Sequence, residues 1–146
     1  MKIFLDSCVW FAAIISPVGG SAALINKIIV LSEKTDIWII ISNEVIAETL
    51  KNLKQKSQPE KLLDFIKLYY KSPIIIYEGT NECVSRWVKH IHPEDALIAC
   101  SAVEAKCNYF ATLDKKHFFK KETFELAKSM KIIFPGDLLH ELRKIK

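Results

Sequence analysis

The sequence lacks the glycine-rich motifs by which many α/β proteins bind nucleotides. It contains neither the G-x-x-x-x-G-K-[ST] loop nor the G-x-G-x-x-G turn, both of which hold phosphates on backbone N–H groups. Nucleotide-binding α/β folds therefore lose their usual recognition feature. Internal repeats, low-complexity tracts and linkers are absent too, and the 146 residues fit one domain over residues 1–146.

Cysteines with metal-binding spacing are also missing. The four cysteines form no C-x-x-C pair, and no histidine lies at zinc-finger spacing from two of them. Three stand among apolar residues, where a free thiol behaves as a small hydrophobic side chain. We expect reduced thiols in a cytoplasmic protein, because disulfides are rare in that compartment. The four residues are Cys8, Cys83, Cys100 and Cys107.

No apolar run is long enough to span a membrane. Residues 7–26 carry no charge and follow Lys2, as in a signal peptide. The segment Ser16–Ser21 nevertheless breaks this run, and the longest remaining piece is Val9–Ile15. A spanning helix needs about 20 apolar residues. We therefore expect neither export nor membrane insertion.

The formal net charge of +4 is unevenly distributed. Acidic and basic residues balance over residues 1–95, so the positive excess lies in residues 96–146. Such a patch attracts the phosphates of nucleic acids, although an ordinary solvated surface explains the patch alone equally well. The candidates for RNA binding are its densest lysines, Lys115, Lys116, Lys120 and Lys121.

Short β-type runs alternate with longer helical patterns along the chain. Expected strands cover residues 2–5, 37–41, 73–77, 108–112 and 131–134. The second is a continuous run of apolar residues, typical of a strand that is buried on both faces. Strands separated by helices predict right-handed crossovers and a mostly parallel sheet with helices on both faces.

Capping residues and prolines predict where the helices begin. The Ser42 hydroxyl can accept a free backbone N–H and so predicts a helix to about residue 54. Pro59 and Pro93 suit the first turns of helices that end near residues 71 and 106. Other expected helices flank the break at residues 17–20, follow Thr80, cover 122–130 and follow a capping Asp137.

Four acidic residues follow the ends of expected strands or begin the helices after them. Asp6 and Asp114 directly follow the first and fourth strands, while Glu48 and Asp95 lie near helix starts. Ligands of open α/β sheets bind beyond the carboxyl ends of the strands, so the four acids should meet there. Grouped carboxylates repel one another unless a cation lies between them, and hard oxygen ligands suit Mg²⁺ or Mn²⁺. Two such ions about 4 Å apart can activate water for phosphodiester hydrolysis.

Each acid has a purely structural interpretation when it is taken alone. Asp6 and Asp114 suit turns or helix caps, and Asp95 suits the dipole at the first turn of a helix. Glu48 suits an exposed helix face, where Glu44, one turn earlier, competes for any role. The order of all four relative to the strands is what favours a metal site.

The same residues resemble the PIN-domain family. The resemblance rests, in order, on Ile3–Val9, Ser42 with Glu48, Asp95–Ala102 and Thr112–Phe118. It implies a three-layer α/β/α sandwich with a mostly parallel sheet and a Mg²⁺- or Mn²⁺-dependent nuclease site. By this resemblance, the metal-binding and catalytic acids would be Asp6, Glu48, Asp95 and Asp114. The Ser7 and Thr112 hydroxyls would orient a carboxylate or a bound water; alternatively, each simply faces the core or a turn.

The resemblance also implies a function and partners. Small PIN proteins resemble the endoribonuclease toxins of type II toxin–antitoxin pairs, which implies an RNA substrate, a homodimer and a small antitoxin. Helices over Val9–Ile15 and Leu62–Tyr70 offer partner surfaces, or pack in the core. The alternative is a non-catalytic PIN-fold module that binds RNA or protein. Cys8 stands where many relatives carry Asn, and residues 54–81 do not match the pattern.

Other enzyme classes lack a required partner residue. Haloacid dehalogenase-like phosphatases need a second Asp two positions after Asp6, where Cys8 stands, and receiver domains need paired acids before the phosphoacceptor. A phosphatase nucleophile at Cys8 would need a glycine-rich loop ending in Arg, which residues 9–16 do not supply. His92 and His117 lie near the acids, where they could contact substrate or metal or simply face solvent.

Overall fold

The computed structural model describes all residues from 1 to 146 and contains one sheet of five parallel strands. The strand order is β3-β2-β1-β4-β5, so the first strand is central. The predicted strands and their parallel arrangement are confirmed. The strands are β1 (Lys2–Leu5), β2 (Trp38–Ile41), β3 (Ile74–Ile76), β4 (Tyr109–Ala111) and β5 (Lys131–Ile133).

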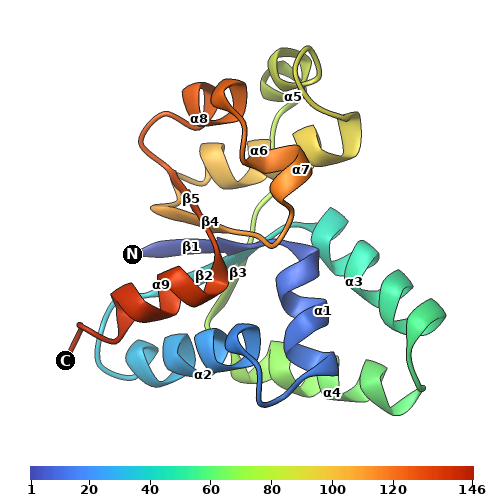
Figure 1. Cartoon of the computed structure of the whole chain (residues 1–146), viewed down its shortest axis with the longest axis vertical. Coiled ribbons are helices and arrows are strands. Elements are labelled where there is room, and N and C mark those ends of the chain that lie inside the picture. Colours follow the sequence, from blue (N-terminus) through green and yellow to red (C-terminus); the bar gives the residue numbers. More distant parts are fainter.

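Helices cover both faces of the sheet and give three α/β/α layers, as predicted (Figure 1). In that view α1, α2, α4 and α9 lie below the sheet, and α5, α6 and α8 lie above it. The helices are α1 (Ser7–Ile15), α2 (Gly20–Ser32), α3 (Asn43–Lys56), α4 (Glu60–Lys71), α5 (Asn81–Trp87), α6 (Pro93–Glu104), α7 (Lys115–Phe118), α8 (Lys121–Ala127) and α9 (Pro135–Leu142).

The register of the central strands fixes the carboxyl end of the sheet. In β1, Leu5 is the Cα partner of Ala111 in β4, and both residues are fully buried. The Phe4 and Phe110 rings stack with centroids 5.3 Å apart, which adds packing to this pair of strands. Residues that directly follow β1 and β4 therefore leave the sheet side by side.

Side-chain caps start several helices where they were predicted. Ser42 accepts from the N–H of Val45 at 3.3 Å, and Thr80 accepts from that of Cys83 at 3.3 Å. The prediction that Asp137 caps the last helix is wrong, because α9 begins at Pro135, whose fixed φ suits a first turn. Asp137 instead lies inside that turn, where an acid complements the helix dipole.

One disulfide overturns part of the cysteine prediction. Cys83 in α5 and Cys100 in α6 are bonded, with Cα atoms 5.8 Å apart, so they are not free thiols. Two hydrogen bonds join the same region, from Gly79 N–H to Ser101 and from Thr80 N–H to Glu104. A side chain at Gly79 would lie 2.8 Å from the Cys100 Cβ, so only glycine permits this approach. Cys8 and Cys107 are free.

No single helix has the length and apolarity required to cross a membrane. Helices α1 and α2 meet the requirement together, by length and composition only, but they are bent by 102°.

The disulfide leads to a stability prediction. Replacing Cys83 and Cys100 together by Ala should lower the free energy of unfolding by about 2–4 kcal/mol, because the cross-link restricts the unfolded chain. Urea unfolding without reductant, followed by circular dichroism, measures the change. The wild-type protein in dithiothreitol should lose a similar amount. A wild-type midpoint that does not move with reductant would contradict this contribution.

Candidate active site

The four predicted acids line one cavity of about 210 Å³ at the carboxyl end of the sheet. Asp6 follows β1, Glu48 lies in α3, Asp95 lies in the first turn of α6, and Asp114 follows β4. Their predicted convergence is therefore present in the structure. The other lining residues come from α1 and α3 and are Ser7, Cys8, Phe11, Asn52 and Lys56.

Asp6 is the most buried of these acids, with 4% of its surface exposed. Its Oδ1 accepts from the Ser7 N–H at 2.8 Å, which caps α1, and its Oδ2 accepts from the Thr112 hydroxyl at 2.8 Å. The pKa of Asp6 is raised to about 6, chiefly by burial and also by charge repulsion from Glu48, while the hydrogen bonds from Thr112 and Ser7 oppose the rise. An ionised Asp6 is thus costly unless a cation approaches it.

Thr112 connects Asp6 with the second strand-end acid. Its Oγ1 donates to Asp6 and accepts from the Asp114 N–H at 3.0 Å. The free Cys8 joins the same network, because its Sγ lies 3.5 Å from both Asp6 Oδ2 and Thr112 Oγ1 and accepts from the Leu113 N–H at 3.3 Å. Burial, with the charge of Asp6, raises the pKa of Cys8 to about 12, which keeps the thiol protonated.

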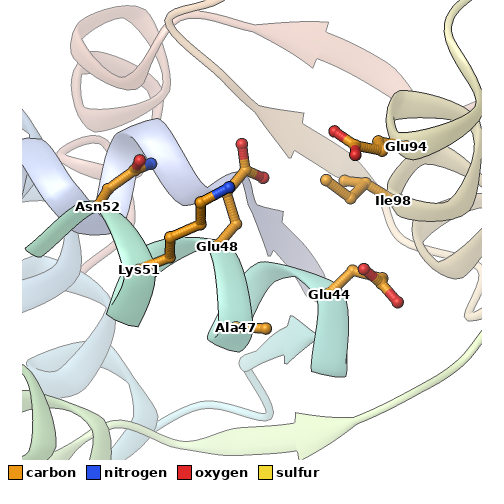
Figure 2. Close-up of a pocket in the computed structure, with 7 residues that line it drawn as sticks. All are labelled: Glu44, Ala47, Glu48, Lys51, Asn52, Glu94 and Ile98. Carbon is orange, nitrogen blue, oxygen red and sulfur yellow. The ribbon is translucent and has the colours of Figure 1, made fainter. Parts of the chain in front are cut away.

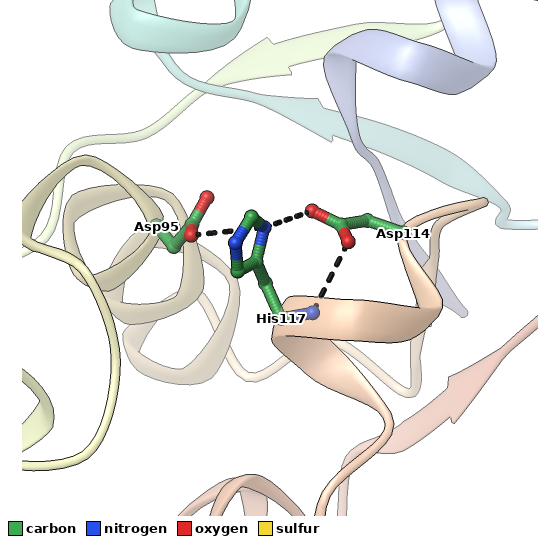
Figure 3. Close-up of side chains that lie close together, drawn as sticks. All are labelled: Asp95, Asp114 and His117. Atoms are coloured by element: carbon green, nitrogen blue, oxygen red, sulfur yellow. Dashed lines mark hydrogen bonds and ion pairs between the residues drawn. The ribbon is translucent and has the colours of Figure 1, made fainter.

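His117 lies between Asp95 and Asp114 (Figure 3). Its Nδ1 is 2.6 Å from Asp114 Oδ2 and 3.5 Å from Asp95 Oδ2. Asp114 is the N-cap of α7, and its Oδ1 accepts from the His117 N–H at 3.1 Å. Burial raises the pKa of Asp95, His117 lowers it, and Asp114 raises it again. The imidazole therefore separates two carboxylates that would otherwise repel each other.

The donor atoms are of the kind that binds small divalent cations. Ligand atoms of Asp95, Asp114 and His117 all lie within 4.8 Å of one another. Asp6 and Glu48 place further carboxylates on the same cavity. Oxygen donors from two or more carboxylates suit Mg²⁺ or Mn²⁺, and the open side of the cavity leaves positions for water. The residues present fit a divalent metal site.

A second hollow of about 240 Å³ lies beside the cavity, between α3 and α6 (Figure 2). Glu48 and Asn52 line both spaces. Glu44 lines only the second hollow, opposite Glu94, and therefore does not replace Glu48 among the four acids. Its three carboxylates outnumber its one lysine, Lys51, so the hollow carries a net negative charge.

The predicted hydroxyl residues contact Asp6, whereas the predicted RNA-binding lysines lie outside the cavity. The Thr112 hydroxyl contacts Asp6, whereas Ser7 does so through its backbone N–H. None of the four predicted RNA-binding lysines lines the cavity. Lys115 Nζ lies 5.3 Å from the centroid of the Phe134 ring, and Lys121 Nζ lies 4.0 Å from Glu125.

Sequence reasoning missed the apolar Phe11 and two polar residues of the cavity wall, Asn52 and Lys56. The two polar residues belong to α3. They follow Glu48 at intervals of four residues in α3, so they share its helix face. Lys56 is the single cation that lines the cavity, and it forms no ion pair within the protein. The four-residue spacing could have indicated that these residues share a face with Glu48. Only the packing of α3 shows that this face lines the cavity.

Comparisons with known proteins agree with this architecture. The sequence model of the PIN domain matches residues 3–122. No curated protein matches the chain. PAE2754 from Pyrobaculum aerophilum has a TM-score of 0.65 at 16% identity, over 99% of this chain and 96% of its own.

Two further solved structures are similar. VapBC2 from Rickettsia felis, bound to a DNA fragment from their promoter, has a TM-score of 0.63 at 17% identity, over 92% of this chain and 98% of that one. VapC20 from Mycobacterium tuberculosis, a toxin that cleaves the sarcin-ricin loop, has a TM-score of 0.57 at 13% identity, over 78% and 91%. At these identities the likeness shows the fold.

The buried Asp6 carboxylate predicts a pH-dependent stability. Its folded-state pKa of about 6 exceeds the ordinary 3.8, so the folded protein holds the proton more tightly than the unfolded chain does. The free energy of unfolding should therefore fall by about 3 kcal/mol as the pH rises from about 3 to 7 in EDTA. Urea unfolding of wild type and Asp6→Asn across this range measures the effect, which the variant should lack. Asp137→Asn, outside the cavity, should behave like wild type; equal profiles for wild type and Asp6→Asn would refute the assignment.

Proposed function

Because the chain belongs to the PIN-domain family, we propose that residues 1–146 form a divalent-metal-dependent endoribonuclease domain that hydrolyses RNA phosphodiester bonds. The observation that carries this proposal is the convergence of Asp6, Glu48, Asp95 and Asp114 on one cavity. Burial and neighbouring acids make ionised Asp6 and Asp95 costly without a cation. The site also offers no thiolate or activated hydroxyl nucleophile. Metal-activated water is the chemistry that such a donor set supports best.

The protein's own residues would hold and orient the reacting groups. Bound Mg²⁺ or Mn²⁺ would supply an activated water and stabilise negative charge on the phosphate. Thr112 and the Ser7 N–H hold both oxygens of Asp6, so this carboxylate is preorganised. Asp95, Asp114 and Glu48 complete the acidic wall, and Lys56 supplies a positive charge at its rim. We assign the four acids as metal-binding and catalytic on this basis.

A toxin role with an antitoxin partner is the finer form of the proposal. It is supported by the likeness to VapBC2 and VapC20. A hollow of about 330 Å³ between α1, α2 and α4, lined mainly by apolar residues such as Ile14, Pro17 and Leu68, offers a partner surface. Most of Val9–Ile15 is buried in the core, so only the end of α1 contributes. We further propose a homodimer that acts in the cytoplasm, where its RNA substrate lies; the Cys83–Cys100 bond would then be an exception to the rarity of disulfides in that compartment.

Cleavage assays test the nuclease directly. Purified protein should cut a mixed-sequence RNA with Mn²⁺ or Mg²⁺ but not with EDTA. Asp95→Asn should lower the rate by about 10²–10³-fold, because it weakens binding of the metal ion that would stabilise negative charge in the transition state. Asp137→Asn, which changes an acid in α9 outside the cavity, is the matched control and should cut normally.

The outcomes of this assay separate the alternatives. A folded, partner-free protein that binds RNA without cutting it under any metal would favour a non-catalytic PIN-fold module. Equal cutting by wild type and Asp95→Asn would contradict the assignment of this acid.

RNA binding should depend on Lys56. With Asp95→Asn as the background, so that the RNA stays intact in Mg²⁺, Lys56→Ala should weaken binding and lower the salt-dependence slope by about 0.7, the value for one single-strand phosphate contact. Lys54→Ala removes an exposed lysine of α3 that does not line the cavity and should change less. Fluorescence anisotropy at several salt concentrations gives both quantities.

The lysine patch has its own test in the same assay. Replacing Lys120 and Lys121 together should also flatten the slope if the patch attracts phosphates. An unchanged slope would leave Lys56 as the main contact, and an unchanged slope in Lys56→Ala would exclude that residue.

A further inference from the structure

His117 lies beside two acids, at distances that would also suit a ligand of a metal ion bound by them. Its Nδ1 is 2.6 Å from Asp114 Oδ2 and 3.5 Å from Asp95 Oδ2. Adjacent ligands of an octahedral ion, with bonds of about 2.1 Å, lie about 3 Å apart. Both observed distances are within about half an ångström of that spacing. Small side-chain shifts would thus place one ion against all three atoms (Figure 3).

The backbone explains why these atoms meet. Asp114 caps α7, so its Oδ1 is held by the His117 N–H and its Oδ2 faces the imidazole. A carboxylate and a histidine three residues apart recur as a ligand pair in carboxylate-bridged metal proteins. Here the cap itself brings the pair together, because Asp114 precedes α7 and His117 lies within it. Asp95 comes from α6, a separate element, and closes the third side. The trio thus joins two independently fixed segments.

His117 also has the freedom that a ligand needs. Its side chain is 41% exposed, and its ring makes no hydrogen bond to a residue other than Asp95 and Asp114. No core packing therefore opposes a small rotation towards an ion. In the metal-free protein the imidazole ring lies between Asp95 and Asp114 and reduces the repulsion between their carboxylates.

We propose that His117 Nδ1 directly coordinates the divalent ion held by Asp95 and Asp114, and that this nitrogen shifts the site's preference from Mg²⁺ towards Mn²⁺. The inference rests on the proposed metal-dependent function. An all-oxygen site suits Mg²⁺, whereas an imidazole ligand favours transition metals, and Mn²⁺ accepts both kinds of donor. The other positions of the ion remain for water, Asp6, Glu48 or the substrate.

Pulsed electron paramagnetic resonance of the Mn²⁺-loaded full chain tests the ligand without reference to activity. Bound Mn²⁺ should show coupling to a directly bonded ¹⁴N, which should change to ¹⁵N coupling in protein with ¹⁵N-labelled histidine. The coupling should disappear in His117→Phe, which keeps a ring but has no nitrogen. It should persist in His90→Phe, an exposed histidine outside the cavity.

Metal titrations give the selectivity. His117→Phe should weaken Mn²⁺ binding at least about tenfold, in line with the loss of groups that support metal ligands. Mg²⁺ binding, measured by competition, should change less than about threefold, because Mg²⁺ gains little from nitrogen. Equal losses for both ions would contradict the selectivity.

The possible results separate this inference from the nuclease proposal. Bound Mn²⁺ without nitrogen coupling in wild type, or with coupling that persists in His117→Phe, overturns the ligand role even if RNA is cut. Nitrogen coupling that depends on His117, in a protein that cuts no RNA, supports the ligand and contradicts the nuclease. Absence of Mn²⁺ binding overturns the ligand role, and the nuclease proposal falls with it only if Mg²⁺ neither binds nor supports cleavage. If His117→Phe does not fold, His92→Phe decides, because it removes the other histidine near Asp95. The histidine ¹⁵N coupling should persist in this variant, and its loss would overturn the role of His117.

Discussion

The pairing of β1 with β4 is the constraint on which the candidate site depends. Leu5 lies opposite Ala111, and the Asp6 N–H extends the ladder by donating to the Ala111 carbonyl at 3.0 Å. The next residue of β4's chain, Thr112, therefore emerges beside Asp6 and donates to its carboxylate. A slip of one residue would turn Thr112 to the opposite face and leave a buried carboxylate with one fewer donor. Because Thr112 also accepts from the Asp114 N–H, this register places the second strand-end acid as well.

The site is electrostatically unfavourable in the metal-free protein, and the fold holds it in place. Burial raises the pKa values of both Asp6 and Asp95, and neighbouring acids raise them further. Such perturbed carboxylates are typical of functional sites, where the surrounding structure tolerates a local cost. Here the strands that carry Asp6 and Asp114 lie in the centre of a fully buried hydrophobic core. That core fixes the backbone that carries Asp6 and Asp114, so only side-chain rotation can separate their carboxylates.

The sequence was informative where one strong local signal decides the structure. Continuous apolar runs predicted the buried parallel strands, and Ser42, Thr80 and Pro93 marked helix starts because capping acts within three residues. Four-residue α7 carries no comparable signal, so the approach of His117 to Asp95 could not be derived. The bond between Cys83 and Cys100 was missed because the two residues are 17 positions apart and form no motif. Pairings of that kind depend on how α5 packs on α6.

Helix α3 gives the cavity its polarity. Glu44 lies in its first turn and Lys54 and Lys56 in its last, an order that also stabilises the helix through its dipole. The stability of α3 alone would explain the order of acidic and basic residues along the helix. It does not explain why these residues line the cavity and the neighbouring hollow. Glu44 and Glu94 line the hollow on one side of Glu48, whereas Lys56 lines the cavity on the other. Lys51 also lines the hollow, so each space carries one lysine beside several carboxylates. The basic residues of this face thus follow its acidic residues along α3. A polyanion therefore meets repulsion at the Glu44 end and attraction towards Lys51 and Lys56, so the Lys56 end is the favourable approach to the four acids.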